Sequence, residues 1–327
     1  MTLLEVDNLH VAIRSARGVV QAVRGVDLQI ERGETLAIVG ESGCGKSITA
    51  LSIAGLLPAA AALSAGNIVF DGQRLNTLNE AQWNRVRGAR IGFVFQNPMS
   101  SFNPSMRIGE QIAESLRAHR ALSLRAANVR AVQLLDRMRV ANAAARARQY
   151  PFEFSGGMLQ RAMIAMAVAC EPDLLIADEP TTALDVTVQK EVLQLLRELQ
   201  RDSGMACLLI THDLGAVAQM ATRVAVMYAG EIIERGPVDA IFKHSAHPYT
   251  RGLRAALPGA NRGELIAIAG TPPDLTQQWR GCSFYPRCNY AMHICDRERV
   301  PDFIAGEDHT ARCWLLDSRA QKISDAL

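Results

Sequence analysis

Short runs of consecutive apolar residues divide the chain. LAIV at 36–39, LLIA within DLLIAD at 173–178, and CLLI within CLLIT at 207–211 each hold four apolar residues in a row. Runs of this kind, without alternation, are typical of central parallel strands that are buried on both faces. The pattern therefore predicts a parallel sheet at the centre of the molecule.

Other patterns predict what surrounds this sheet. Residues 1–40 alternate in part between apolar and polar positions, which predicts strands joined by a turn at 16–18. Further strands are predicted at 67–72, at 91–95 and as a pair over 223–236. Helical periodicity predicts helices over 46–57 and 187–202, and an Arg-rich helical region from about 97 to 170. After residue 250 we expect a loop-rich chain with a boundary at Pro272–Pro273.

The composition is that of a globular protein, because 49% of the residues are hydrophobic and 21% are charged. This excludes an intrinsically disordered chain. The net charge of +2 is too small to indicate a nucleic-acid or membrane-surface partner. The most apolar stretch, 51–70, is interrupted by glycine and proline and does not predict a membrane span. The N-terminus has acids where a signal peptide is basic, so we expect a cytosolic protein without structural disulfides.

A phosphate-binding loop is predicted directly after the first apolar run. GESGCGKS at 40–47 fits the pattern G-x-x-x-x-G-K-[ST] and lies between a predicted strand and a predicted helix. Its glycines let backbone N–H groups surround phosphate oxygens, and the start of the helix adds positive potential. Lys46 would reach the β- and γ-phosphates, and the hydroxyl of Ser47 would bind Mg²⁺. The candidate nucleotide-binding residues here are Gly40, Ser42, Gly43, Cys44, Gly45, Lys46 and Ser47.

A pair of acids follows the second apolar run. LLIADEP at 174–180 contains Asp178, which would hold Mg²⁺, and Glu179, which would polarise an attacking water. Phosphoryl transfer needs mainly positioning and charge neutralisation, and these groups supply both. An acid pair alone is weak evidence, but together with a phosphate-binding loop it indicates hydrolysis of a nucleoside triphosphate.

Two polar residues lie where strands of the predicted sheet end. Gln96 follows the strand at 91–95, and His212 follows the strand at 207–211. Open α/β sheets bind their ligands at the carboxyl edge of the strands. We therefore expect Gln96 and His212 to face the γ-phosphate, with Gln96 also contributing to the Mg²⁺ site.

The octet FSGGMLQR at 154–161 precedes the acid pair. Ser155 can cap the helix that follows, while Gly156 and Gly157 leave backbone N–H groups open to an anion. Considered alone, the octet is equally the start of an ordinary capped helix.

In their order and spacing, these motifs resemble those of the ATP-binding subunits of ABC transporters. GESGCGKS resembles Walker A, FQNP the Q-loop, FSGGMLQR the signature motif, LLIADEP Walker B, TALD (182–185) the D-loop and THD the H-loop. The resemblance covers residues 1 to about 255. ADEPTTALDVTVQ, VMYAGEIIERG, HPYT and a cysteine-bearing tail are most similar to the oligopeptide/dipeptide importer branch.

The resemblance implies an α/β P-loop NTPase fold of ABC type, with an antiparallel β subdomain, a helical signature subdomain over about 97–170 and a small Cys-rich tail. It also implies an ABC ATPase domain at 1–255 and a C-terminal region at 256–327. Two such subunits face each other head to tail, so Ser155, Gly156 and Gly157 would bind ATP held by a partner's Walker A. Glu179 would be the catalytic base and His212 the γ-phosphate sensor.

The implied function is ATP hydrolysis that powers the import of di- or oligopeptides. The expected partners are a second, different ATPase subunit, two membrane permease subunits and, indirectly, a solute-binding protein, with no nucleic acid. The expected location is peripheral, on the cytoplasmic face of the inner (cell) membrane. One alternative is the same role for nickel, a metallophore or another small solute. A soluble ABC-type ATPase acting on DNA or ribosomes is a second alternative, disfavoured by the single set of motifs and the net charge of +2.

Two positions depart from the family pattern. Cys44 stands where the family commonly has serine, and it is either an oxidisable thiol of lowered pKa at a helix N-terminus or a small tolerated residue. Ile13 stands where family members stack the adenine on an aromatic residue, and no aromatic residue precedes Phe70. The adenine would then rest on aliphatic surface.

Four of the seven cysteines lie within 32 residues of the tail, at Cys282, Cys288, Cys295 and Cys313. Such clustering in a cytosolic protein indicates a metal site rather than disulfides. The spacing matches neither the common zinc ribbons nor the common ferredoxin patterns. The resemblance implies a 4Fe-4S cluster, and zinc or four free buried thiols are the alternatives.

Overall fold

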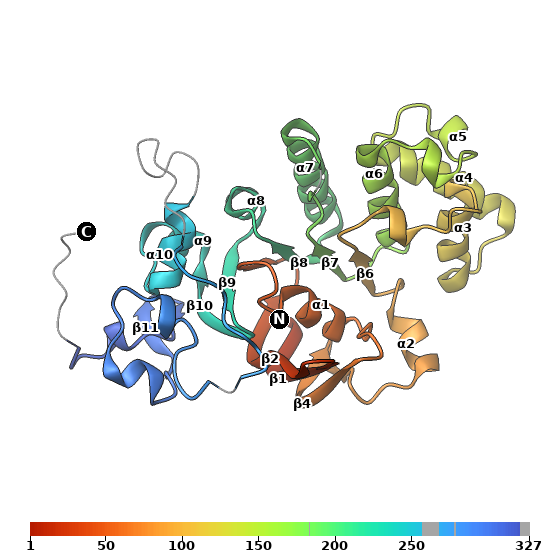
Figure 1. Ribbon diagram of the computed structural model, residues 1–327. Helices are drawn as coiled ribbons and strands as arrows, with labels where there is room; N and C mark the ends of the chain where they lie inside the picture. Colours follow the sequence, from red (N-terminus) through yellow and green to blue (C-terminus); the bar gives the residue numbers. More distant parts are fainter. Residues whose placement is uncertain (183, 257–267, 278, 321–327) are drawn as a thin grey trace.

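The structure is a computed structural model that describes residues 1–182, 184–256, 268–277 and 279–320. A large mixed sheet crosses the molecule, with a smaller antiparallel sheet on one face and helices on the other (Figure 1). A lobe of helices lies at one end of the large sheet and the C-terminal region at the other. No helix of the described residues is long and apolar enough to cross a membrane.

The large sheet contains eight described strands in the order β11-β12-β10-β9-β3-β8-β7-β6. The five strands from β9 to β6 run parallel to one another. Their bounds are β3 Thr35–Val39, β6 Ile91–Val94, β7 Leu174–Asp178, β8 Ala206–Thr211 and β9 Arg223–Tyr228. β10 (Glu231–Pro237) returns antiparallel to β9, as the strand pair predicted over 223–236.

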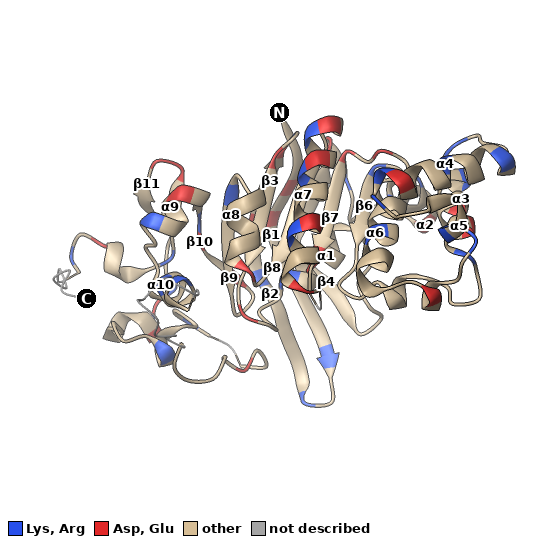
Figure 2. Cartoon of the chain, turned by 90° about the horizontal axis from the view of Figure 1, so that it is seen from above, with Lys and Arg blue, Asp and Glu red and all other residues tan. Residues whose placement is uncertain are grey.

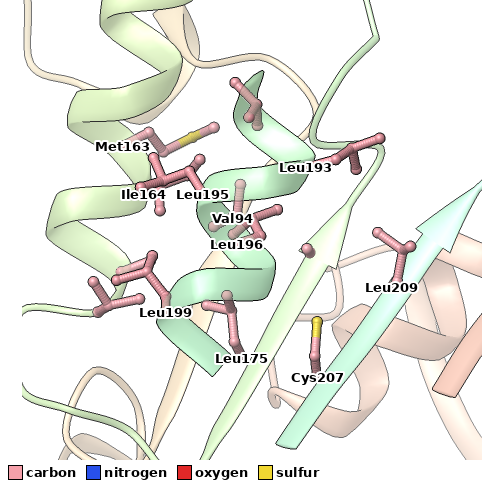
Figure 3. Packing of buried hydrophobic residues seen from close by; sticks show 14 of the residues in the cluster. Val94, Met163, Ile164, Leu175, Leu193, Leu195, Leu196, Leu199, Cys207 and Leu209 are labelled. Atoms are coloured by element: carbon pink, nitrogen blue, oxygen red, sulfur yellow. The ribbon is translucent and has the colours of Figure 1, made fainter. Parts of the chain in front are cut away.

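Each central strand is buried on both faces, as the apolar runs predict. Every residue of β3, β7 and β8 is buried. In β7, Leu175 and Ala177 join one hydrophobic cluster, while Leu174 and Ile176 join another on the opposite face. Figure 3 shows the first face, where leucines of α7 (Val186–Ser203) pack over Leu175. Because alternate side chains fill two separate cores, a polar residue is tolerated only where such a strand ends.

The second face is covered by the antiparallel sheet, in the order β2-β1-β4-β5. Its strands are β1 Thr2–Ser15, β2 Gly18–Glu31, β4 Ala61–Phe70 and β5 Gln73–Arg74. β4 begins six residues before the predicted strand at 67–72, because residues 61–65 pair with β1 despite being mostly alanine. Between the two sheets lies α1 (Lys46–Ile53), which ends earlier than the predicted 57.

The predicted helical region is present. It contains α3 Ile108–His119, α4 Leu124–Arg137, α5 Ala143–Arg146 and α6 Gly156–Ala167, preceded in the chain by α2 Glu80–Val86. Ser123 caps α4 and Ser155 caps α6, since each hydroxyl accepts a hydrogen bond from a backbone N–H in the first turn. The helical lobe shares a hydrophobic core with the large sheet, because residues of α3, α4 and α6 belong to the same cluster as those of α7.

The C-terminal region is joined to the large sheet. After α8 Leu214–Met220, α9 Val238–Lys243 and α10 Pro248–Ala255, the chain adds β11 Phe303–Gly306 and β12 His309–Ala311. β12 pairs antiparallel with β10, so the sheet extends into the tail. The loop-rich prediction missed these two strands, because segments of three and four residues carry too little periodicity to stand out. Five short 3-10 helices complete the described elements, at Met99–Ser101, Pro151–Glu153, Tyr285–Arg287, His293–Asp296 and Trp314–Leu316.

Candidate functional site

The phosphate-binding loop connects the end of β3 to the first residue of α1, as predicted. Its backbone lies against neighbouring strands so closely that a side chain does not fit at two positions. A Cβ on Gly40 would lie 2.2 Å from the carbonyl oxygen of Met227, and one on Gly45 would lie 2.4 Å from that of Ala22. Both glycines also have positive φ, which L side chains rarely adopt. The glycines therefore let the loop curl in the narrow space between β9 and β2.

Lys46 lies inside the curve of this loop. Its Nζ donates hydrogen bonds to the carbonyl oxygens of Gly40 (2.8 Å) and Glu41 (2.9 Å), and the residue is only 4% exposed. A compact ammonium charge is thus held at the start of α1, beside the backbone of the loop. This is the arrangement expected for a group that receives anionic phosphate oxygens.

Cys44 is a residue of the phosphate-binding loop whose side chain is buried. Burial raises the pKa of its thiol, an effect that the nearby Lys46 only partly offsets. The alternative of a reactive thiol with a lowered pKa is therefore wrong for this structure. Cys44 fills the space of a small side chain, and its Sγ lies 3.9 Å from Lys46 Nζ.

Ser47 and Asp178 meet across the space between α1 and β7. The Ser47 hydroxyl donates a hydrogen bond to Asp178 Oδ1 at 3.0 Å, and Asp178 is 6% exposed. Burial raises the pKa of Asp178, and the adjacent Glu179 adds to the rise, while Ser47 and Lys46 oppose it. A hydroxyl and a desolvated carboxylate are hard oxygen ligands of the kind that Mg²⁺ prefers.

Glu179 lies at the centre of a polar group at the carboxyl edge of the sheet. Its carboxylate accepts hydrogen bonds from Gln96 Nε2 and Thr182 Oγ1, both at 2.9 Å. His212 Nδ1 lies 3.3 Å from the other carboxylate oxygen. Glu179 also has a φ of 47°, a left-handed backbone conformation that is uncommon for glutamate and often marks a functional site. The structure thus brings together Gln96, Glu179 and His212; the sequence analysis did not single out Thr182, although it opens the predicted D-loop.

The signature residues lie elsewhere. Ser155 Oγ accepts a hydrogen bond from the N–H of Met158 at 3.3 Å, which confirms the predicted helix cap. A Cβ on Gly156 would meet nothing within 4 Å, so this position faces open space, whereas a Cβ on Gly157 would lie 2.8 Å from Val188 of α7. α6 belongs to the helical lobe, whereas α1 and its loop lie between the two sheets (Figure 1). Ser155, Gly156 and Gly157 are therefore not assembled with the phosphate-binding loop of their own chain.

Residues of the C-terminal part contact the phosphate-binding loop, and the sequence analysis missed them. Arg287 donates to both carboxylate oxygens of Glu41, at 2.7 and 3.0 Å. The backbone N–H of Glu41 donates to the hydroxyl of Tyr249 at 2.8 Å. The hydrogen bond with Glu41 raises the pKa of Arg287. Since Glu41 and Arg287 are 246 positions apart, no local pattern could indicate the pair.

The four tail cysteines line one cavity, together with His247, Tyr285, Tyr290, Val300 and Trp314 among others. Burial raises the pKa of Cys282 and of Cys313 to about 12, and the other thiols of the group add to the rise. His247 Nδ1 accepts a hydrogen bond from the N–H of Tyr249, which leaves Nε2 facing Cys282 Sγ at 3.9 Å. Within the described residues, no three His, Cys, Asp or Glu side chains are placed to hold one metal ion.

The phosphate-binding loop, the acid pair and the polar residues at one sheet edge define a P-loop ATPase of the ABC class. A family model described as "ABC transporter" matches residues 23–182. Another, described as "Oligopeptide/dipeptide transporter, C-terminal region", matches residues 233–295.

Similar proteins agree over nearly the whole chain. The dipeptide transport ATP-binding protein DppD of Bacillus subtilis is 48% identical over 322 residues, covering 98% of this chain and 96% of that protein. The oligopeptide transport ATP-binding protein OppD of the same organism is 49% identical, covering 98% of this chain and 91% of that protein. Among solved structures, a dimeric ATP-binding cassette in a post-hydrolysis state with ADP and Pi matches with a TM-score of 0.66 and 28% identity, covering 72% of this chain and 99% of that one. The chain therefore belongs to the family of ABC transporter ATP-binding proteins and is an ATPase.

Proposed function

We propose that this chain powers the import of di- or oligopeptides through an ABC transporter. The observation that carries the proposal is the match along nearly the full chain, tail included, to ATP-binding proteins named for dipeptide and oligopeptide transport. The ATPase core alone is shared by many transporters, so the match of the C-terminal region is the more specific support.

The cargo is tested by loss and rescue. A strain that lacks this chain should fail to take up a labelled di- or tripeptide, and the wild-type chain should restore uptake while Lys46→Ala does not. Restored uptake of nickel or a metallophore, with peptide uptake unchanged, would replace peptides by the alternative cargo.

We propose that the loop from Gly40 to Ser47 binds the triphosphate of ATP, with Lys46 at the β- and γ-phosphates. Ser47, Asp178 and Gln96 would hold Mg²⁺, which neutralises phosphate charge when bound. The 3.0 Å contact of Ser47 with Asp178 supports this set, because it already places two hard oxygen ligands together.

Glu179 is proposed as the base that takes the proton of the attacking water. Gln96 and Thr182 orient its carboxylate, leaving the other oxygen toward His212. His212 would report the presence of the γ-phosphate from this position. A base held by two hydrogen bonds loses little conformational freedom when the substrate arrives.

The signature residues are proposed to act on a second subunit's ATP. Ser155, Gly156 and Gly157 stand at the open start of α6, away from their own phosphate-binding loop. Backbone N–H groups at such a helix start suit a γ-phosphate brought by another ATPase subunit. We propose that this partner is a different ATPase chain and that both dock on two permease subunits at the cytoplasmic face of the cell membrane. A solute-binding protein would select the cargo.

A soluble ATPase acting on DNA or ribosomes has less support. Basic and acidic residues stand side by side along α7 in Figure 2, and the net charge is +2. A nucleic-acid-binding surface needs a basic patch that neutralises phosphates.

The four tail cysteines are proposed to hold a 4Fe-4S cluster. Four thiols facing one cavity fit this group, because burial disfavours their thiolate forms and a positively charged metal centre would compensate the thiolate charge when bound. A single Zn²⁺ needs all four sulfurs about 2.3 Å away, whereas a cluster of four irons spans a wider cavity.

Metal analysis of the anaerobically purified chain tests this proposal. We expect about four irons and four sulfides per chain, lost in Cys288→Ser and kept in Cys170→Ala, a buried cysteine outside the cavity. One zinc per chain without iron would replace the cluster by zinc, and a metal-free chain would overturn both.

A further inference from the structure

Glu41, the second residue of the phosphate-binding loop, is held at three points. Its carboxylate is paired with Arg287, its backbone N–H donates to Tyr249 Oη, and its carbonyl oxygen accepts from Lys46 Nζ. Two of these three contacts come from chain segments beyond residue 248. The position of the loop around Lys46 thus depends on groups outside the ATP-binding motifs.

The side chain of Arg287 is buried and fixed by several hydrogen bonds. Its side chain is 5% exposed, and it donates to Glu41, to the carbonyl oxygens of Ile268 and Ala269, and to Tyr228 Oη at 3.3 Å. The guanidinium also lies 5.8 Å from the ring centroid of Phe284. A planar guanidinium that makes this many directed hydrogen bonds has little freedom to move. Its bidentate pair fixes both the distance and the angle of the partner carboxylate.

The two segments that hold Glu41, around Tyr249 and around Arg287, also contain residues of the cysteine cavity. His247 accepts from the N–H of Tyr249 and faces Cys282, while Arg287 immediately precedes Cys288. Tyr228, Tyr249 and Phe284 pack against one another between the cavity and the loop, with ring centroids 4.5 to 5.5 Å apart. Both supports of Glu41 are therefore sequence neighbours of residues that line the cysteine cavity, Pro248 and Cys288.

Charge explains why the support matters for a triphosphate. A carboxylate in a phosphate-binding loop repels phosphate, and Glu41 is only 26% exposed, so water screens it incompletely. Pairing with Arg287 neutralises this charge and keeps it turned toward the tail. Removing Arg287 would leave a half-buried carboxylate without its partner next to the phosphate site.

We propose that Arg287 is a positioning residue for ATP binding: through Glu41 it neutralises and orients the phosphate-binding loop, which makes the cysteine-bearing tail part of the nucleotide site. The proposal rests on the proposed nucleotide site. It predicts an effect on ATP affinity rather than on the chemical step, because Arg287 touches no group assigned to hydrolysis.

The test is a titration of the full chain with a fluorescent ATP analogue and Mg²⁺. Arg287→Ala should weaken binding about 10-fold, and Arg287→Lys, which keeps the charge without the bidentate geometry, should fall between. Glu41→Gln combined with Arg287→Ala should recover most of the loss, since no unpaired carboxylate remains. Arg297→Ala is the matched control in the tail, because Arg297 is 72% exposed and pairs with its neighbour Asp296. In the assembled transporter, Arg287→Ala should raise KM for ATP and leave kcat nearly unchanged.

Two outcomes overturn the proposal. Wild-type affinity of Arg287→Ala, with binding lost in Lys46→Ala, shows that the nucleotide site is correct but needs no support from the tail. Equal losses in Arg287→Ala and in the double variant show general structural damage rather than a role of the Glu41 charge. If Lys46→Ala also binds normally, the proposed nucleotide site itself is wrong.

Discussion

At the scale of single residues, the site depends on keeping two adjacent acids in different environments. Asp178 is the last residue of a strand buried on both faces, and it contacts the hydroxyl of Ser47. Glu179 is turned away by its left-handed backbone and contacts Gln96 and Thr182 instead. Under the proposed mechanism, one acid would thus face the metal side of the phosphates and the other the water side, although they are neighbours in sequence.

Glu179→Gln should bind ATP and barely hydrolyse it. The amide keeps the shape and can still contact Thr182, but it cannot take a proton, and loss of a general base costs about 10²–10⁴-fold in rate. Lys46→Ala should instead lose ATP binding. Single-turnover hydrolysis in the assembled transporter measures the effect of Glu179→Gln, and nucleotide titration measures the effect of Lys46→Ala. Wild-type turnover of Glu179→Gln would show that another residue is the base.

Asp178→Asn should stabilise the nucleotide-free protein while abolishing Mg²⁺-dependent hydrolysis. The folded protein raises the pKa of Asp178 through burial, so its ionised form is disfavoured relative to the unfolded chain. That penalty is absent at low pH and grows as pH rises through the raised pKa. Asparagine is neutral at every pH and can keep the contact with Ser47. Thermal melts without nucleotide at pH 8 and near the ordinary aspartate pKa of about 4 should show the larger gain in Tm at pH 8; an equal or opposite effect would contradict the assignment.

At the scale of elements, Glu234 of β10 joins three segments. It is 1% exposed, and its carboxylate accepts hydrogen bonds from the N–H groups of Ala246 and His247 and lies 2.8 Å from His309 Nε2 of β12. One buried side chain therefore ties together the main sheet, the start of α10 and the last tail strand.

Glu234→Ala should destabilise the protein by about 3–5 kcal/mol, because it leaves several buried polar groups without their partner. The tail should loosen first, since β12 is only three residues long and meets the sheet through β10. Denaturant unfolding measures the total loss, and hydrogen exchange at residues 303–311 measures the local one. Asp239→Ala in α9, whose carboxylate is 84% exposed, is the control; equal losses in both variants would show that the buried network has no special role.

The buried strands of the sheet could be predicted from the sequence, whereas contacts between distant segments could not. The four-residue apolar runs predicted β3, β7 and β8 because burial on both faces leaves no polar position within them. Motif residues then followed at the strand ends, which is why Gln96, Glu179 and His212 could be placed at one edge. The contact of Arg287 with Glu41 could not be predicted, because its energy comes from tertiary packing between distant segments. The strands β11 and β12 were missed for a different reason, because four and three residues are too few to show a period.

At the scale of the whole molecule, the residues proposed to form the two halves of an ATP site lie in different parts of the chain. The phosphate-binding loop lies between the two sheets and the signature residues lie at the start of α6, so under this proposal one chain alone would present half of each of two sites. We expect the isolated chain to be largely monomeric and slow, with hydrolysis restored by the partner ATPase.

Gly156→Asp tests whether each ATP site is shared between two subunits in this way. A side chain fits there, because a Cβ on Gly156 meets nothing within 4 Å, and an acid at a helix start does not weaken the helix. It should still repel the γ-phosphate of ATP bound to the partner. In the assembled complex, Lys46→Ala should remove ATP turnover at this chain's own loop, Gly156→Asp should remove it at the partner's loop, and the two together should remove both. Gly156→Ala is the control, expected to keep at least half of the wild-type rate. Transport-level hydrolysis by the monomer, or full turnover at both loops in Gly156→Asp, would contradict the composite site.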